Sequence, residues 1–350
     1  MLSSACVIAS ILNASTTTDK MLKAGGRSGG FIAKSLLETG RFNITALTRP
    51  DSSSELPSGV KIAKASNDDH DALVAALRGQ DVLLITLSVL APEGTQAKLI
   101  RAAADAGVPW VVPNDWGFDT SDEAVVNDIP GASKTPQGRK DIAETGVSSY
   151  ISFTTGFWYE WSLAIPPSFG FDFPNKAATF FDEGETKISS STWPQVGRAV
   201  ASLLSLPIKP EGANVERCLE NFRNKVVYVN SFNVSQKDML DSVLRVTGDK
   251  LEDWTITKEP AKERYASAAK ALQSGERMAY VRMMYTRIFF DDGNGNFEAR
   301  KGTSNKLLDL PRESLDEATA RSIERADASP WAASKRVEGR HQQAARGEAL

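Results

Sequence analysis

A glycine-rich stretch that runs directly into an amphipathic helix constrains this sequence most. Glycine fills four of the six positions 25–30, and Phe31, Ile32, Leu36 and Leu37 follow at the spacing of one buried helical face. A helix start leaves backbone N–H groups free, its dipole favours a phosphate, and glycine allows the closest approach. The stretch therefore predicts a dinucleotide site, with a cradle formed by Gly26, Arg27, Ser28 and Gly29.

Two other interpretations of the same residues remain open. Gly26-x-x-Gly29 alone also fits an ordinary loop before a surface helix. The run 26–30 satisfies G-x-S-x-G as well, the nucleophile elbow of hydrolases, with Ser28 as nucleophile. That chemistry needs a histidine later in the chain, and both histidines, His70 and His341, lie in polar segments, which disfavours it.

The residues after this helix indicate which dinucleotide is bound. Apolar and β-branched residues over 42–48 predict a strand that ends at Arg49. An acidic residue at this position holds the ribose hydroxyls in sites that prefer NAD. Arg49 instead attracts a 2′-phosphate, and Arg27 offers a second cation, so the predicted cofactor is NADP(H). The alternative is that Arg49 is a solvated arginine at a strand end.

Strands and helices alternate along the next part of the chain. The apolar pattern predicts strands over 60–65, 81–88 and 108–112, with helices over 67–77 and 95–106 between them. This alternation predicts an α/β fold with a Rossmann-like, doubly wound parallel sheet and a smaller α+β substrate lobe. Ligands of such sheets lie beyond the carboxyl ends of the strands. The cofactor is therefore expected near Arg49, Thr86, Leu87, Ser88 and Asn114, with Trp116 close by.

The expected domain boundaries begin with an unusual N-terminus. A first strand should precede the glycines directly, but Thr16–Lys23 is too polar for a strand buried on both faces. We therefore expect an atypical leader over 1–22, which lacks the basic start of a signal peptide. The expected order is then a Rossmann domain over 23–155, which 225–248 rejoins, a substrate lobe over 156–330 and a disordered tail over 331–350.

Composition excludes several classes of function. The net charge is −3 and the only cysteines are Cys6 and Cys218, which disfavours nucleic-acid binding, disulfides and, with two histidines, a zinc site. No apolar run reaches the roughly 20 residues of a membrane helix. We expect a cytoplasmic protein with a small-molecule substrate, no metal, and neither nucleic acid nor membrane as a partner.

Aromatic residues gather after a predicted strand over 148–153. Phe157, Trp158 and Tyr159 follow its carboxyl end, and Phe169 lies in an irregular segment over 166–174. They predict a site wall, with Phe157 beside the cofactor and a substrate pocket lined by Trp116, Trp158, Tyr159 and Phe169. Ordinary packing in a core is the alternative for each of them.

Five short motifs together carry a resemblance to a known family. From Ala24 to about Leu310 the chain resembles the NmrA-like and isoflavone reductase-like branch of atypical short-chain dehydrogenases, in its fungal form. The resemblance implies an NADPH-binding Rossmann domain and a smaller substrate lobe. Reductases of this family act on aromatic or phenolic frameworks, whereas its regulatory members bind the dinucleotide and report redox state. The motifs are Gly26–Gly29, Thr48-Arg49, Pro113–Gly117, Thr155–Glu160 and Asn305–Leu308.

The sequence departs from the family pattern at two places. Lys23 stands where the first glycine of the loop is usual, and no tyrosine has a lysine four residues later, as classical short-chain dehydrogenases do. Reductases of this branch instead carry a lysine at the start of the helix before the Tyr150 strand. Lys134 is the nearest match and Lys140 the second choice. The lysine is expected to position the nicotinamide ribose or to act as a general acid, the alternative being a solvated helix lysine.

These residues lead to two functional hypotheses. The first is an NADPH-dependent reductase of a small aromatic or conjugated carbonyl compound, with Lys134 as proton donor or positioner. The second is a non-catalytic regulator that binds NADP(H) and a protein partner. A third, lesser outcome is that Lys23 and the polar segment before it abolish cofactor binding.

Overall fold

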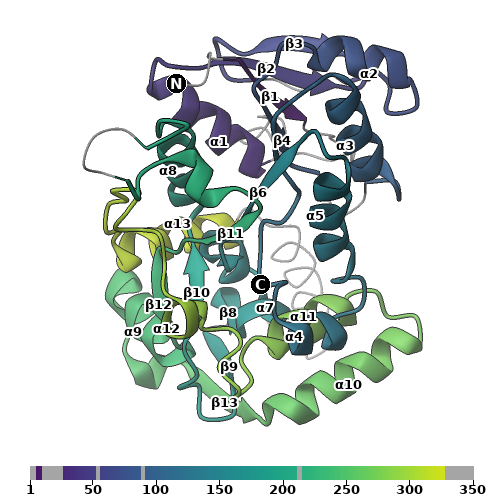
Figure 1. Ribbon diagram of the computed structural model, residues 1–350. Coiled ribbons are helices and arrows are strands. Elements are labelled where there is room, and N and C mark those ends of the chain that lie inside the picture. Colours follow the sequence, from purple (N-terminus) through teal and green to yellow (C-terminus); the bar gives the residue numbers. More distant parts are fainter. Residues whose placement is uncertain (1–4, 10–26, 53–55, 88–90, 211–214, 328–350) are drawn as a thin grey trace. The chain divides into compact units, whose positions relative to one another are not determined.

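The chain forms two units, each assembled from separate stretches of sequence. The computed structural model describes residues 5–9, 27–52, 56–87, 91–210 and 215–327. Unit 1 consists of residues 1–156, 193–230 and 301–311, and unit 2 of residues 157–192, 231–300 and 312–350. Both units are drawn in Figure 1.

Unit 1 is built on a seven-stranded sheet in which every pair of neighbours is parallel. The strand order is β11-β6-β5-β4-β1-β2-β3. The order reverses between β1 and β4, which makes this the switch point of a doubly wound sheet and confirms the predicted fold class. The strands are β1 (Ala5–Ala9), β2 (Asn43–Thr48), β3 (Lys61–Lys64), β4 (Val82–Ile85), β5 (Trp110–Val112), β6 (Ser149–Thr154) and β11 (Lys225–Tyr228).

Helices cover both faces of this sheet (Figure 1). In β4, Val82 and Leu84 belong to the apolar cluster under one helix layer, and Leu83 and Ile85 to the cluster under the other. Because both faces are buried, the strand reads as a continuous apolar run. One layer holds α1 (Arg27–Glu38) and α8 (Trp193–Leu204), and the other α2 (His70–Leu77), α3 (Thr95–Asp105) and α5 (Lys134–Glu144), while α4 (Glu123–Asp128) lies in the connection after β5.

The N-terminal segment corrects the sequence analysis. The expected leader over 1–22 contains a strand of the main sheet, because β1 lies within it and pairs in parallel with both β2 and β4. Cys6 is in register with Ile44 on one side and with Val82 on the other. The run Ala5–Ala9 is apolar throughout, as a central strand requires, and it comes earlier than the glycines led us to expect. The polar segment Thr16–Lys23 lies outside the described residues.

The division into units also differs from the expected boundaries. Strand β11 joins the main sheet, as predicted, but the part of 225–248 beyond Asn230 belongs to unit 2. Residues 193–224 and 301–311, which were assigned to the substrate lobe, belong to unit 1. The expected tail over 331–350 lies outside the described residues.

Unit 2 combines short sheets with helices, as expected for an α+β lobe. One sheet has the order β12-β10-β7 and the other β13-β9-β8. The segment 166–174, predicted to be irregular, contains a short helix and a short strand. The strands are β7 (Phe157–Trp158), β8 (Phe171–Asp172), β9 (Ala177–Phe181), β10 (Ile188–Ser191), β12 (Phe232–Val234) and β13 (Thr255–Glu259), and the helices are α6 (Tyr159–Ser162), α7 (Pro166–Phe169), α9 (Gln236–Thr247), α10 (Ala261–Gln273), α11 (Ala279–Arg287), α12 (Phe297–Lys301, whose last residue falls in unit 1) and α13 (Leu315–Asp327).

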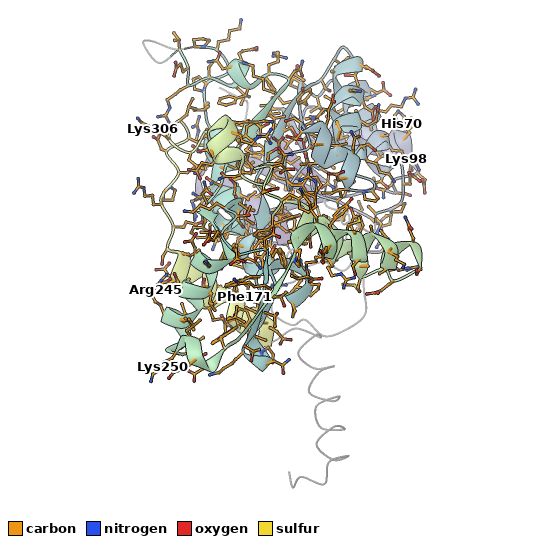
Figure 2. The ribbon with its side chains drawn as sticks, turned by 90° about the horizontal axis from the view of Figure 1, so that it is seen from below. His70, Lys98, Phe171, Arg245, Lys250 and Lys306 are labelled. Atoms are coloured by element: carbon orange, nitrogen blue, oxygen red, sulfur yellow. The ribbon has the colours of Figure 1, made fainter. Side chains whose placement is uncertain are left out.

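Ion pairs join neighbouring helices at the surface of each unit. In unit 1, His70 of α2 lies 2.8 Å from Asp105 of α3, and Lys98 of α3 contacts Asp68. Figure 2 labels His70 and Lys98, which lie near each other at the edge of the molecule. In unit 2, Arg245 of α9 pairs with an aspartate at the start of α13. These exposed pairs each contribute little to stability, so unit 1 depends mainly on its two buried apolar clusters.

We expect Gly197→Ala to destabilise unit 1, because α8 packs closely against α1 at this glycine. A Cβ at Gly197 would lie 2.6 Å from the Phe31 carbonyl oxygen and 2.6 Å from Ser35 Oγ, and the backbone contact has no flexible side chain to yield. Overpacking of this kind costs about 1–3 kcal/mol. Urea unfolding measures the loss. Gly117→Ala is the control, since a Cβ there meets nothing within 4 Å. Equal stability of the two variants would contradict the close packing.

Candidate functional site

Three threonines mark the carboxyl edge of the sheet in unit 1. Thr48 ends β2, Thr86 follows β4 and Thr154 ends β6, with exposed fractions of 5%, 7% and 0%. The Oγ1 atom of each is buried and has no hydrogen-bond partner among the described residues. A buried polar atom without a partner costs about 1–3 kcal/mol. These hydroxyls therefore point to a ligand at this edge. Sequence reasoning singled out Thr86 but missed the other two, although each is a hydroxyl residue at a strand end.

Cations gather at the turn after β2. Arg49 is largely buried, and its Nε lies 3.6 Å from the exposed Asp51 carboxylate. Lys64, the last residue of β3, is in register with Thr48, and its Nζ donates a hydrogen bond of 3.2 Å to the Pro50 carbonyl oxygen. Two positive side chains and one carboxylate thus share a single turn. Arg49 was predicted here, whereas Lys64 was missed because only the strand register brings it to this turn.

The predicted glycine cradle is described only in part. Helix α1 begins at Arg27, so the helix starts within the glycine-rich stretch and includes Gly29 and Gly30. Ser28 and Gly29 lie in its first turn and both are buried. Gly26 and the side chain of Arg27 lie outside the described residues, as does Lys23. The free N–H groups of this helix start have the chemistry that binds a phosphate.

Hydrogen bonds connect the segments that follow β4 and β5. The backbone N–H of Leu87 donates to Asn114 Oδ1 over 2.9 Å. The backbone N–H of Asn114 donates in turn to Gln96 Oε1 of α3 over 2.8 Å. The Trp116 indole N–H donates to the Ile85 carbonyl oxygen over 2.8 Å. The structure therefore brings Leu87, Asn114 and Trp116 together at this edge, while Ser88 lies outside the described residues.

A buried ion pair fixes the segment after β5. Asp115 is 3% exposed and lies 3.1 Å from Nη1 of the equally buried Arg139 of α5. Thr120 Oγ1 and Ser152 Oγ also donate to the Asp115 carboxylate. Burial raises the pKa of Asp115 to about 6, although the positive charge of Arg139 acts in the opposite direction. Sequence reasoning missed this pair; its signal is an arginine on the buried face of α5, beside Ile142.

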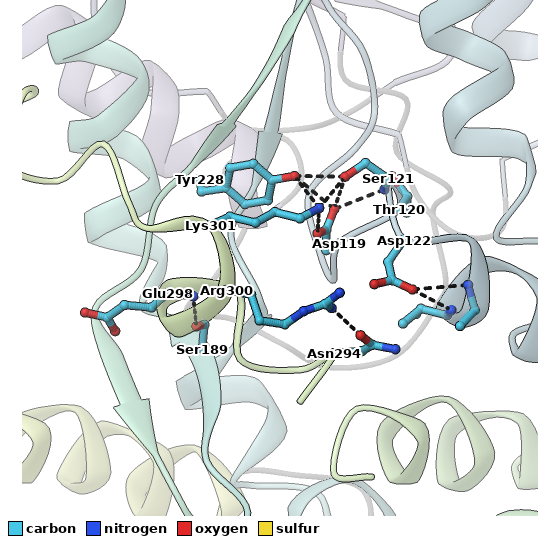
Figure 3. Close-up of polar contacts among 12 residues, drawn as sticks. Asp119, Thr120, Ser121, Asp122, Ser189, Tyr228, Asn294, Glu298, Arg300 and Lys301 are labelled. Carbon is cyan, nitrogen blue, oxygen red and sulfur yellow. Dashed lines mark hydrogen bonds and ion pairs between the residues drawn. The ribbon is translucent and has the colours of Figure 1, made fainter. Parts of the chain in front are cut away.

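A second polar cluster ties the same segment to β11. Lys301 Nζ lies 2.5 Å from the buried Asp119 carboxylate, 2.9 Å from Ser121 Oγ and 3.0 Å from the Tyr228 hydroxyl (Figure 3). Tyr228 is the last residue of β11, and its hydroxyl lies 2.8 Å from Ser121 Oγ. The loop after β5 is thus held at both ends of residues 115–121.

The candidate catalytic lysines both lie on α5. Lys134 is its first residue, and its Nζ donates to Glu93 Oε1 over 2.8 Å. Its side chain is 70% exposed, and that of Glu93 is 84% exposed. Lys140 is also exposed. Burial therefore does not distinguish the two lysines, since both are exposed. The contact with Glu93 is what distinguishes Lys134.

Of the aromatic residues predicted to line the site, Trp116 belongs to unit 1 and the other four belong to unit 2. Phe157 stacks on Tyr285 with ring centroids 3.9 Å apart. Tyr159 and Phe169 are 0% exposed, and their rings are tilted relative to each other with centroids 6.5 Å apart in the core of that unit. Trp158 is partly buried. The packing interpretation therefore describes the surroundings of Tyr159 and Phe169 in this structure, and Trp158 keeps an exposed part.

The described residues contain neither a metal-binding cluster nor a membrane-spanning helix. No group of three or more His, Cys, Asp or Glu side chains in this part of the chain is arranged to hold a metal ion. No described helix is both long and apolar enough to cross a membrane.

Comparison with known proteins agrees with the motifs. Residues 20–166 match the model of the NmrA-like family. The predicted resemblance to this family is confirmed. The oxidoreductase aprR of Aspergillus flavus is 27% identical over 306 residues, which cover 85% of this chain and 95% of that relative.

Solved structures of several reductases share the fold. The pinoresinol-lariciresinol and phenylcoumaran benzylic ether reductases give a TM-score of 0.68 at 17% identity, over 91% of this chain and 99% of theirs. The NADPH-dependent quinone oxidoreductase QOR2 of Escherichia coli, complexed with NADPH, gives 0.60 at 18% identity, over 90% and 98%. At these identities the likeness is one of fold, so the site must be argued from this chain's own residues.

The pH dependence of stability tests the burial of Asp115. Its pKa is about 6 in the folded chain against an ordinary value of 3.8, so folding binds a proton between these values. The stabilisation is complete below about pH 4 and is lost as the pH rises through about 6. The wild type should therefore lose up to about 3 kcal/mol of unfolding free energy relative to Asp115→Asn between about pH 4 and pH 7. Urea unfolding at a series of pH values measures this difference.

The control for this measurement is Asp241→Asn, which changes an exposed carboxyl on α9. Its unfolding is measured over the same pH series. A difference between the wild type and Asp115→Asn that stays constant, or that grows in favour of the wild type as the pH rises, would show that Asp115 is not desolvated as described.

Proposed function

We propose that this chain is an NADPH-dependent reductase of a small aromatic or conjugated carbonyl compound. The observation that carries the proposal is the pair of buried, unpartnered hydroxyls of Thr48 and Thr86. They lie on opposite sides of the β1–β4 switch point, where doubly wound sheets bind dinucleotides. Arg49 and Lys64 supply positive charge on the β2 side of this switch.

The residues of unit 1 fit the parts of NADP(H). Ser28 and Gly29 at the start of α1 would hold the pyrophosphate. Thr48 and Arg49 would hold the adenosine ribose and its 2′-phosphate. The nicotinamide half would lie beside the residues after β4 and β5, namely Thr86, Leu87 and Asn114. The bound cofactor supplies the hydride.

The charges at the β2 turn favour the phosphorylated cofactor. A phosphate monoester carries nearly two negative charges, and Arg49 and Lys64 offer two positive ones. Asp51 works against this preference, because its carboxylate lies 3.6 Å from Arg49 Nε and competes for the same guanidinium. The turn therefore has a built-in attraction for the 2′-phosphate and one group that weakens it.

Lys134 is the proposed proton donor, or the residue that positions the donor, in the reduction. A carbonyl that receives hydride at carbon needs a proton at oxygen, and an ammonium within reach donates it or orients the group that does. Lys134 stands at the start of α5, held at 2.8 Å by Glu93. The activities named for two of the structural neighbours, on quinones and on phenylcoumaran benzylic ethers, support an aromatic substrate. Trp116 of unit 1 remains a proposed aromatic contact.

A non-catalytic NADP(H)-binding regulator is the second candidate. The observation that favours it is the exposed state of Lys134, whose ammonium is paired with an equally exposed carboxylate. Cofactor binding at the strand ends does not require this lysine. A regulator would bind NADP(H) and a protein partner without turnover.

Cofactor titration tests the proposed site. We expect the wild type to bind NADPH much more tightly than NADH. Nicotinamide fluorescence measures both affinities. Arg49→Met should lower the affinity for NADPH roughly tenfold or more, which corresponds to about 1.4 kcal/mol of binding free energy. The affinity for NADH should be nearly unchanged. Asp51→Asn should strengthen NADPH, because it removes the competing charge. Arg101→Met, an exposed arginine of α3, is the control. Binding of neither nucleotide by the wild type would overturn the proposal.

Turnover separates the reductase from the regulator. NADPH oxidation is followed over a panel of aromatic aldehydes, ketones, enones and quinones. Lys134→Ala should lose most of the turnover and keep NADPH affinity, whereas Lys140→Ala on the same helix should keep both. Turnover that survives Lys134→Ala with every substrate would remove its assigned role. NADPH binding without oxidation over the whole panel would favour the regulator.

A further inference from the structure

Gln96 occupies a central place among the segments that surround the proposed cofactor site, although no motif includes it. We propose that Gln96 is a positioning residue that sets the nicotinamide side of this site. The inference rests on the proposed function, because it assumes that NADP(H) binds at the carboxyl edge of the sheet.

The first support is a chain of hydrogen bonds that starts at Gln96. Its Oε1 accepts from the backbone N–H of Asn114 over 2.8 Å, and Asn114 Oδ1 accepts from the backbone N–H of Leu87 over 2.9 Å. Gln96 stands in the first turn of α3, so a helix holds the segments after β5 and β4 in one arrangement. Groups held in this way keep their geometry when a ligand binds.

The second support comes from α5, on the other side of the Gln96 amide. A Cβ at Gly138 would lie 2.3 Å from Gln96 Nε2 and 3.2 Å from its Cδ, so the amide fits against α5 only because position 138 is glycine. A glycine inside a helix costs about 0.5–1 kcal/mol relative to alanine. Room for the Gln96 amide is a physical reason for the glycine at this position.

Helix α5 is also joined to the segment just before α3, one turn away. Lys134 precedes Gly138 by four residues, and Glu93 precedes Gln96 by three. Lys134 and Glu93 are in contact at 2.8 Å. Gln96 therefore links the helix that carries the proposed proton donor to the segment that contains Asn114.

The switch point of the sheet divides the cofactor between two groups of residues. Arg49 lies after β2, on one side of β1, whereas Leu87 and Asn114 follow β4 and β5 on the other. A dinucleotide that spans the switch places its adenosine half on the first side and its nicotinamide half on the second. A change at Gln96 should therefore act on the nicotinamide half alone.

The experiment compares two ligands that share the adenosine half. NADPH and adenosine 2′,5′-bisphosphate are titrated against the wild type, Gln96→Met and Gln96→Glu. Gln96→Met keeps side-chain length but removes the acceptor for the Asn114 N–H, and should weaken NADPH roughly three- to tenfold. Affinity for the bisphosphate should stay within about twofold. Gln96→Glu keeps an oxygen acceptor and should restore most of the NADPH affinity.

Two further variants sharpen the comparison. Gly138→Ala displaces the Gln96 amide from the α5 side and should reproduce the effect of Gln96→Met. Gln137→Met, an exposed glutamine beside that glycine, is the matched control and should change neither affinity. Thermal unfolding of each variant reports whether it is folded.

The outcomes separate this inference from the proposed function. Equal loss of both ligands in Gln96→Met would show a general structural role and overturn the inference. Unchanged NADPH binding in Gln96→Met would overturn it as well, while normal binding by the wild type left the proposed function standing. Failure of the wild type to bind either ligand would overturn both together.

Discussion

Burial of the central parallel strands on both faces is the constraint on which the rest of unit 1 depends. Along β4, side chains alternate between two apolar clusters, and none of the four strand residues reaches solvent. A polar group within such a strand would lose its water without gaining a partner. Buried hydroxyls without a partner in these strands therefore lie at the strand ends. The hydroxyls of Thr48, Thr86 and Thr154 all appear where β2, β4 and β6 stop.

The same constraint explains why charge is concentrated in the connection after β5. This connection carries the buried Asp115 and Asp119, and each meets a cation from a distant part of the chain, Arg139 or Lys301. Removing one member of such a pair leaves a buried charge uncompensated, at a cost of about 3–5 kcal/mol. The two pairs fix where the connection runs. Asn114 and Trp116, which contact the ends of β4, inherit their positions from this anchoring.

Local patterns predicted the elements well, because each depends on residues near in sequence. The apolar spacing and the polar breaks placed β2 to β5 and the helices between them, and the serine and glycine around α9 close that helix at both ends. Strand β1 was missed because a first strand was expected directly before the glycines. The apolar run Ala5–Ala9 instead lies well before them in sequence.

The parts of the site that escaped sequence reasoning depend on contacts between distant residues. Lys64 reaches the turn after β2 through strand register, and Arg139 reaches Asp115 from another element. The contact of Gln96 with Gly138 joins two helices whose own patterns do not show it. Conversely, the aromatic residues after β6 predicted a site wall. The sequence pattern of Tyr159 and Phe169 is the same for residues that line a site and for residues that pack in a core. In this structure both side chains are fully buried.

Binding and chemistry rest on interactions of different strength in this fold. The groups proposed to hold the cofactor stand at the ends of buried strands, where the sheet itself fixes them. The group proposed to deliver the proton, Lys134, is held by an ion pair in which both side chains are mostly exposed. Exposed pairs are worth at most about 1 kcal/mol, so substitutions at Lys134 or Glu93 leave the fold nearly unaffected. A reductase and a cofactor-binding regulator can therefore share this sheet edge and differ mainly at the start of α5.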